Sequence, residues 1–150
     1  MSWLEDIRRQ KSAEERKRKN AFDLAVKRVR AKAKTLDPIV QKYLNDFGKT
    51  CWGSSLLSDT YAIAAGMRGQ NWIWSIEHTW DTAGILNVAA LEVHLKIDPT
   101  GQDFEFMLIE PEKLTDLGPR YPCTQEGLTT MLREVYERWL VEAHKHHLKQ

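Results

Sequence analysis

Several features that mark common protein classes are missing from this sequence. No apolar run approaches the roughly 18 residues of a membrane-spanning helix, and Trp3, Leu4 and Ile7 stand among charged residues where a secretion signal would have an apolar core. Cys51 and Cys123 lack a CxxC partner, which favours reduced, buried thiols over a disulfide framework or a zinc site and leaves a bridge between them open. We therefore expect a cytoplasmic protein without a membrane span.

Motifs for catalysis, metal binding and nucleotide binding are also missing. No residue pattern of these kinds rises above background, so the sequence assigns neither a catalytic residue nor a cofactor, and we lean against an enzyme. At 150 residues the chain has the length of one domain, which buries roughly two-thirds of its unfolded surface. We expect a single domain over residues 1–150.

Charge, in contrast, is unevenly placed. The first fifty residues carry fourteen Lys/Arg against seven Asp/Glu, a net of +7, whereas the remaining hundred carry eight against fourteen, a net of −6. Between residues 8 and 20 only Ala13 is apolar, so residues 1–20 should form a protruding basic helix or a partly flexible arm. The candidate residues for binding nucleic acid or another partner are Arg16, Lys17, Arg18, Lys19, Lys27, Arg28, Arg30 and Lys34.

This basic segment allows other interpretations. It could pair with the acidic body of a second copy, or lie on an anionic membrane surface with Trp3, Leu4 and Ile7 as anchors. It could also serve only to keep the chain soluble.

Capping signals in the sequence predict where the helices begin and end. Capping-box patterns begin at Ser2 and again at Ser12, so one long helix or two short ones could start here. Within the helical region 21–48, Asp37-Pro38 is typical of an N-cap followed by proline in the first turn, and Gly48 is expected to end that helix. Thr124 should cap a last helix over residues 124–147. Its core-facing stripe comprises Leu128, Leu132, Val135, Trp139 and Ala143.

Between these helical segments, in residues 51–110, the hydrophobic period changes from 3.6 to 2. The alternation predicts strands over residues 60–67, 71–80, 85–97 and 103–109, with a possible further strand near 52–57. Three turns set the expected registers, in which Met67 pairs with Trp72, Trp80 with Ile85, and Ile97 with Phe104. All three registers agree on one apolar face. The expected fold is therefore α+β, a four- to five-stranded antiparallel β-meander with the N-terminal and C-terminal helices packed on one face.

The opposite sheet face mixes small, aliphatic and charged side chains. A helix could cover this face, or it could be a partner surface. The candidate interface residues are Ile73, Val88, Ala90, Met107 and Ile109. Charged neighbours on the same face could do acid–base work or simply pair with one another: Glu92, His94, Lys96 and Glu105.

Aromatic residues gather on the core-facing side of the second strand. They could line a pocket or form the interior of the domain, and the candidate pocket residues are Tyr61, Trp72, Trp74, His78 and Trp80. Three histidines near the C-terminus suit a metal ligand or a solvated helix end: His144, His146 and His147.

The leading functional hypothesis is a non-enzymatic interaction or adaptor module, either a homo-oligomer or bound to a protein partner. The first alternative is a nucleic-acid accessory protein that binds phosphates through its basic N-terminal helix. The second alternative is a small-molecule binder or enzyme with a Trp/His-lined pocket.

Overall fold

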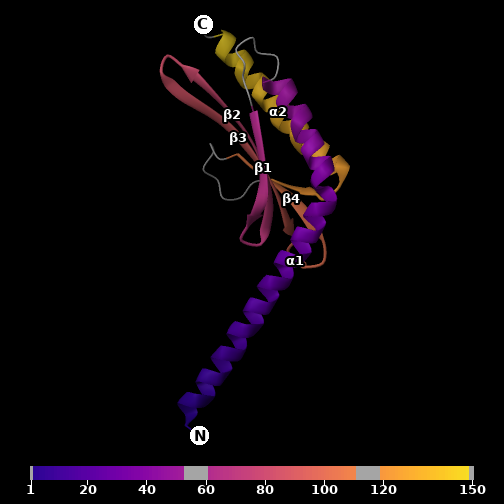
Figure 1. Cartoon of the computed structure of the whole chain (residues 1–150). Helices are drawn as coiled ribbons and strands as arrows, with labels where there is room; N and C mark the ends of the chain where they lie inside the picture. Colours follow the sequence, from indigo (N-terminus) through magenta and orange to yellow (C-terminus); the bar gives the residue numbers. More distant parts are fainter. Residues whose placement is uncertain (1, 53–60, 111–118, 149–150) are drawn as a thin grey trace.

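The chain forms a long helix, an antiparallel sheet and a second helix (Figure 1). The computed structural model describes residues 2–52, 61–110 and 119–148, except for the side chains at 52, 80–82, 87 and 139–148. Its elements are α1 (Trp3–Trp52), β1 (Tyr61–Arg68), β2 (Asn71–Thr82), β3 (Ile85–Ile97), β4 (Phe104–Ile109), β5 (Arg120–Pro122) and α2 (Gln125–Leu148). The predicted α+β class is confirmed.

The sheet is a meander in which each strand pairs antiparallel with the next, in the order β1-β2-β3-β4-β5. Two of the three predicted registers are confirmed, because Met67 pairs with Trp72 and Ile97 with Phe104. The alanine-rich first strand is also confirmed. β5 was not predicted, since three residues between two prolines carry no detectable alternation.

The predicted register between β2 and β3 is wrong by two residues. Thr82, rather than Trp80, pairs with Ile85. Ala83 and Gly84 both adopt positive φ, 53° and 83°, and so form a two-residue turn of the type that matches the twist of paired strands. Because the shift is even, every side chain keeps its predicted face.

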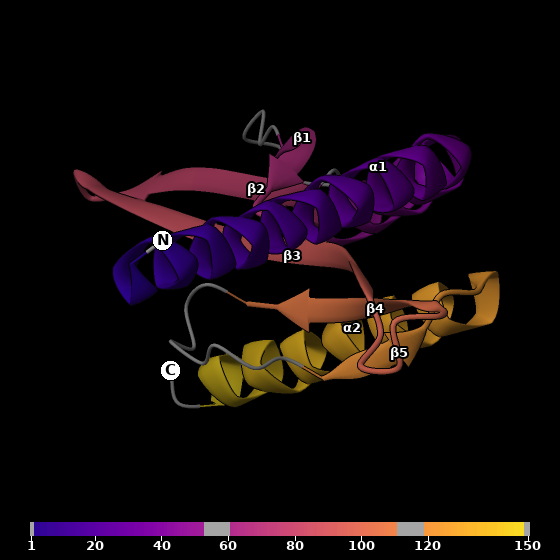
Figure 2. The same ribbon diagram turned by 90° about the horizontal axis from the view of Figure 1, so that it is seen from below.

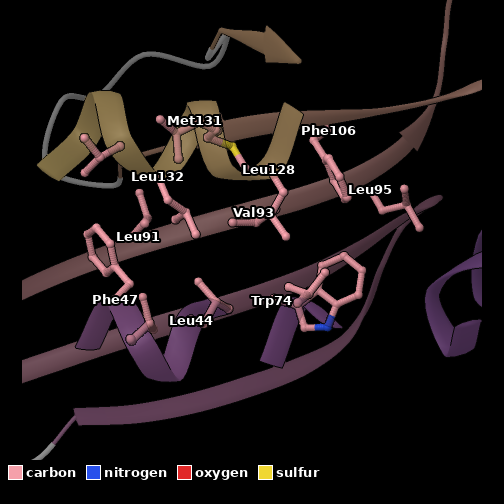
Figure 3. Close-up of a cluster of buried hydrophobic side chains, with 14 of the residues drawn as sticks. Leu44, Phe47, Trp74, Leu91, Val93, Leu95, Phe106, Leu128, Met131 and Leu132 are labelled. Atoms are coloured by element: carbon pink, nitrogen blue, oxygen red, sulfur yellow. The ribbon is translucent and has the colours of Figure 1, made fainter. Parts of the chain in front are cut away.

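Both helices lie on one face of the sheet, and the core fills the space between them and the strands (Figure 3). Leu44 and Phe47 come from α1, whereas Leu128, Met131 and Leu132 come from α2. The strands contribute a layer of fully or almost fully buried residues: Trp74, Ile76, Leu91, Val93, Leu95, Phe106 and Leu108. Since α1 packs on this face, the alternative that α1 covers the opposite face is wrong.

α1 is one continuous helix, so the predicted helix start at Asp37-Pro38 is wrong. Val29 before the proline and Val40 after it are both buried, which means that the sheet holds the helix on either side of the break that proline favours. The carboxylate of Asp37 accepts a hydrogen bond from the indole N–H of Trp74 at 2.8 Å instead of capping a helix. Tertiary contacts therefore override the local signal.

Two further helix boundaries differ from the sequence signals. Ser2 caps α1, since its hydroxyl accepts from the N–H of Glu5, but no second helix begins at Ser12. Gly48 does not end the helix. A Cβ there would lie 2.8 Å from the ring of Tyr61, so glycine serves close packing at this position and the helix runs on to Trp52.

α2 starts at its predicted cap. The hydroxyl of Thr124 accepts from the N–H of Gly127 at 3.0 Å, and a Cβ on Gly127 would lie only 2.1 Å from the carbonyl oxygen of Pro122. Glycine is thus required where α2 meets the end of β5. The possible strand at 52–57 lies outside the described residues apart from Trp52. The side chains of Trp139, Ala143 and the three C-terminal histidines also lie outside the description.

Candidate functional site

The first half of α1 extends away from the sheet (Figures 1 and 2). We call residues 3–24 the arm. Its side chains are exposed except for the half-buried Ser12, and burial against the sheet begins only at Ala25. Trp3, Leu4 and Ile7 are exposed at its tip. The arm therefore presents apolar and charged side chains with no described element of the fold beside them.

A basic stripe follows the solvent side of α1. Arg16, Lys27 and Lys34 fall on the side of the helix opposite the buried Val29, Arg30 lies next to them, and all four are exposed. At 1.5 Å per residue the stripe is about 27 Å long. Residues 16–34 hold nine Lys/Arg and a single acidic residue, so this stretch of helix is strongly positive.

Arg28, a predicted binding residue, is engaged within the fold. Its guanidinium donates to the carbonyl oxygens of Gly101 and Gln102 at 2.9 and 3.3 Å and lies 5.6 Å from the ring centroid of Phe104. Lys32 lies 5.8 Å from the same ring. These two cations fasten α1 to the β3–β4 turn and are less available to a partner than the stripe.

The outer face of the sheet, the face away from the helices, has a buried centre. Ile73, His94 and Met107 lie side by side on β2, β3 and β4, and all three are buried. Of the predicted interface residues, only Val88 is an exposed large apolar side chain, since Ala90 and Ile109 are half-buried. The predicted interface is therefore accessible mainly at the end of the sheet that contains Val88.

Charged side chains on this face pair with one another. Glu92 Oε1 lies 2.9 Å from His94 Nε2 and 3.5 Å from Arg68 Nη1. Glu105 pairs with Lys96 at 3.9 Å and with Arg120 at 3.6 Å. The local charges are therefore largely compensated.

His94 is buried beside Glu92. Burial lowers its pKa, an effect that the hydrogen bond and the charge of Glu92 partly offset. Because Glu92 can only accept, the imidazole donates through Nε2, and its buried Nδ1 is left without a hydrogen-bond partner.

A pocket of about 170 Å³ lies beside Arg68 at the β1 edge, below the size typical of ligand sites. In the described part of the chain, no three His, Cys, Asp or Glu side chains gather as metal ligands.

The predicted aromatic pocket residues are packed into the fold. Trp74 is completely buried and contacts Trp72 and Phe106 edge to face, at centroid distances of 6.2 and 6.4 Å. His78 is buried, and Tyr61 donates from its hydroxyl to Asn45. The side chain of the fifth residue, at position 80, is outside the description. These contacts match the interior interpretation of the aromatic cluster.

A groove between α1 and α2 was not predicted. It has a volume of about 300 Å³ and a mostly apolar wall, and its lining includes Tyr43, Phe47, Thr50, Thr129, Leu132 and Tyr136. Tyr43 and Tyr136 are partly buried and pack against the core. Their positions beside the core-facing stripes of the two helices are the one feature of the sequence that could have indicated this groove.

The β2–β3 hairpin extends beyond the rest of the sheet. β1 pairs with β2 only as far as His78, and β4 pairs with β3 only from Glu92 onward. Residues 79–88 thus form a two-stranded ribbon, visible at the upper left of Figure 1. Its exposed apolar side chains are Ile85 (67% exposed), Leu86 (69%) and Val88 (43%). The sequence feature that could have indicated this exposed apolar ribbon is the stretch 82–91, which contains neither a charged residue nor proline.

The remaining results concern membrane spans and similarity to known proteins. Within the described residues, neither helix combines the length and the apolar character that crossing a bilayer requires. Set against known proteins, the chain matches no family model, no curated protein and no solved structure.

Proposed function

We propose that the protein is a non-enzymatic interaction module that associates with itself. The observation that carries this proposal is the β2–β3 ribbon, on which Ile85, Leu86 and Val88 are exposed. Burying such a side chain is worth about 1.5–3 kcal/mol, so three of them on one projecting hairpin favour a contact that removes them from water.

The outer sheet face supports binding over catalysis. Glu92 is shared between His94 and Arg68, and Glu105 between Lys96 and Arg120, so both carboxylates of the cluster lie beside cations, as in cross-strand ion pairing.

Mass in solution tests the proposal. Sedimentation equilibrium from about 1 to 100 µM should show a species of twice the 17.4 kDa chain mass that forms with rising concentration. A chain lacking residues 1–20 should behave in the same way, because the ribbon lies apart from the arm. A single 17.4 kDa species throughout this range would count against self-association.

A second candidate function is binding of nucleic acid through the arm and the basic stripe. The observation that favours it is the exposed alignment of Arg16, Lys27, Arg30 and Lys34 on one side of α1. Cations spaced along about 27 Å of a rigid helix suit a row of phosphates. They carry no information about base sequence, so affinity for different sequences should be similar.

Salt dependence tests this second function. If four phosphate contacts form, affinity for a generic DNA duplex or single-stranded RNA should fall on the order of 100-fold between 50 and 200 mM salt. The triple charge reversal of Arg16, Lys27 and Lys34 to Glu should abolish most of that salt dependence. Lys42→Glu, a single charge reversal at an exposed position of α1 beyond residues 16–34, is the control. Absence of binding at 50 mM salt would refute this function.

A further inference from the structure

Among the described residues, no strand pairs with the β3 side of the ribbon. Thr82 and Ile85 close a two-residue turn, and in such hairpins the closing pair exchanges both backbone hydrogen bonds. Alternation along the ladder then directs the N–H and C=O of Leu86, Val88 and Ala90 away from β2.

The same alternation explains how β4 pairs with β3. Asp98 donates its N–H to the carbonyl of Asp103 at 2.9 Å, which places the even-numbered residues of β3 in the set that bonds to β4. Glu92, His94 and Lys96 belong to this set and lie opposite β4 residues. In the described chain, β4 ends opposite Glu92, and no strand continues along residues 86–90.

The features that usually prevent edge pairing are absent from this segment. Proteins protect edge strands with charged side chains, proline, bulges or very short strands. Residues 82–91 contain no charge and no proline, and Leu86 and Val88 are exposed beside the open backbone groups. The other edges differ, since β5 has only three residues with Arg120 and Pro122 among them, β1 ends in Arg68, and the β2 side of the ribbon contains Asp81.

We propose that residues 86–90 of β3 pair antiparallel with the same residues of a second copy across a two-fold axis. This inference rests on the proposed self-association and names its interface. Antiparallel pairing of identical edges is self-complementary and closes after two chains. It satisfies the N–H and C=O groups of Leu86, Val88 and Ala90, and it joins the exposed Leu86 and Val88 of both copies into one apolar row on the outer face.

Two substitutions on the open edge test the interface. Val88→Pro removes an N–H that points away from β2, and proline is tolerated at such edge positions. Leu86→Lys adds the kind of charge that protects natural edges. Each should raise the dissociation constant of the dimer at least 10-fold, with thermal unfolding as the check on folding. Ala62→Lys is the control, because it adds the same charge at an exposed position on β1.

Amide hydrogen exchange gives a second, residue-level measurement on the unsubstituted chain. The N–H groups of Leu86, Val88 and Ala90 should be protected at concentrations that favour the dimer and exposed at low concentration. Those of Asn87 and Ala89 bond to β2 and should be protected at both. This alternation distinguishes strand pairing from a contact made through side chains alone.

The outcomes separate this inference from the proposed function. A dimer whose dissociation constant is unchanged by Val88→Pro and Leu86→Lys, or is raised instead by Ala62→Lys, overturns the β3 interface and leaves self-association standing. Equal exchange of odd and even amides in the dimer overturns the interface as well. A chain that is monomeric at every concentration overturns both.

Discussion

Replacing Asp37 with Ala should destabilise the protein by removing one acceptor from its core. Trp74 is completely buried, and its indole N–H donates to Asp37 Oδ1 at 2.8 Å. Gln41 donates to the same oxygen at 3.3 Å, one helical turn further along α1. In the Asp37→Ala variant, the indole N–H of Trp74 stays in the core without an acceptor.

The size of the effect follows from two opposing contributions. A hydrogen bond to a charged group contributes about 1.5–3 kcal/mol to stability. Alanine is a better helix former than aspartate by about 0.5 kcal/mol, which offsets part of that loss. The net loss should be about 1–2.5 kcal/mol in the free energy of unfolding, or a fall in Tm of about 3–8 °C for a chain of this length.

Urea and thermal unfolding of three variants provide the assay. Asp37→Asn keeps an acceptor oxygen and should lose less stability than Asp37→Ala. Asp46→Ala is the matched control, since Asp46 is exposed on the same docked half of α1. A double-mutant cycle with Trp74→Phe should show that the two losses are not additive. If Asp37→Ala unfolds like Asp46→Ala, the bond contributes nothing and the argument fails.

Three further predictions concern reactivity, pH and close packing. Burial raises the pKa of Cys51 from 9.0 to about 11 and also raises the pKa of Cys123. Because only the thiolate reacts, Ellman's reagent should react about 100-fold more slowly with Cys51 in the native chain than in urea. Equal rates would contradict this. Because burial lowers the pKa of His94 below 6.5, the unfolded chain binds more protons in acid, and stability should fall as pH drops from about 7 to 5. His94→Gln should weaken that pH dependence, and an unchanged slope would show that His94 does not cause it. Gly127→Ala should lower the free energy of unfolding by about 1–3 kcal/mol, because its Cβ would meet the carbonyl of Pro122 in β5. At Gly66 a Cβ meets nothing within 4 Å, so Gly66→Ala should not destabilise the protein. Equal effects of the two substitutions on thermal unfolding would refute this contrast.

The two faces of the sheet could be predicted because side chains in a strand alternate with a period of two. An error of two residues in register leaves every side chain on its face, so the core survived the wrong pairing of Trp80 with Ile85. The register itself could not be predicted there. Ala83 adopts positive φ, a conformation that alanine rarely takes. The two-residue turn requires it because this turn type matches the twist of the paired strands.

The continuity of α1 could not be predicted from local signals. Asp37 followed by Pro38 is a strong local indication of a helix start. Tertiary contacts override it, since Val29 and Val40 are buried on either side of the proline and Asp37 accepts from Trp74, 37 positions further along the chain. Gly48 illustrates the same limit, since its role depends on the ring of Tyr61.

The candidate surfaces were predictable to different degrees. The exposed position of the basic stripe follows from helical spacing, which puts Arg16, Lys27 and Lys34 on the side of α1 opposite Val29. Arg28 belongs to the same charge run, but the carbonyls of the β3–β4 turn hold it, and a sequence pattern cannot indicate a contact across 73 positions. The open edge of β3 was missed because it depends on where β1 and β4 end.

The arm and the ribbon extend toward opposite ends of the molecule (Figure 1). Pairing of two β3 edges would bury the ribbons at one end and leave both arms exposed at the other. A contact through the ribbon depends on backbone hydrogen bonds and apolar burial, so it should respond weakly to salt, whereas phosphate binding along the basic stripe should respond steeply. The two surfaces are therefore separable by ionic strength as well as by mutation.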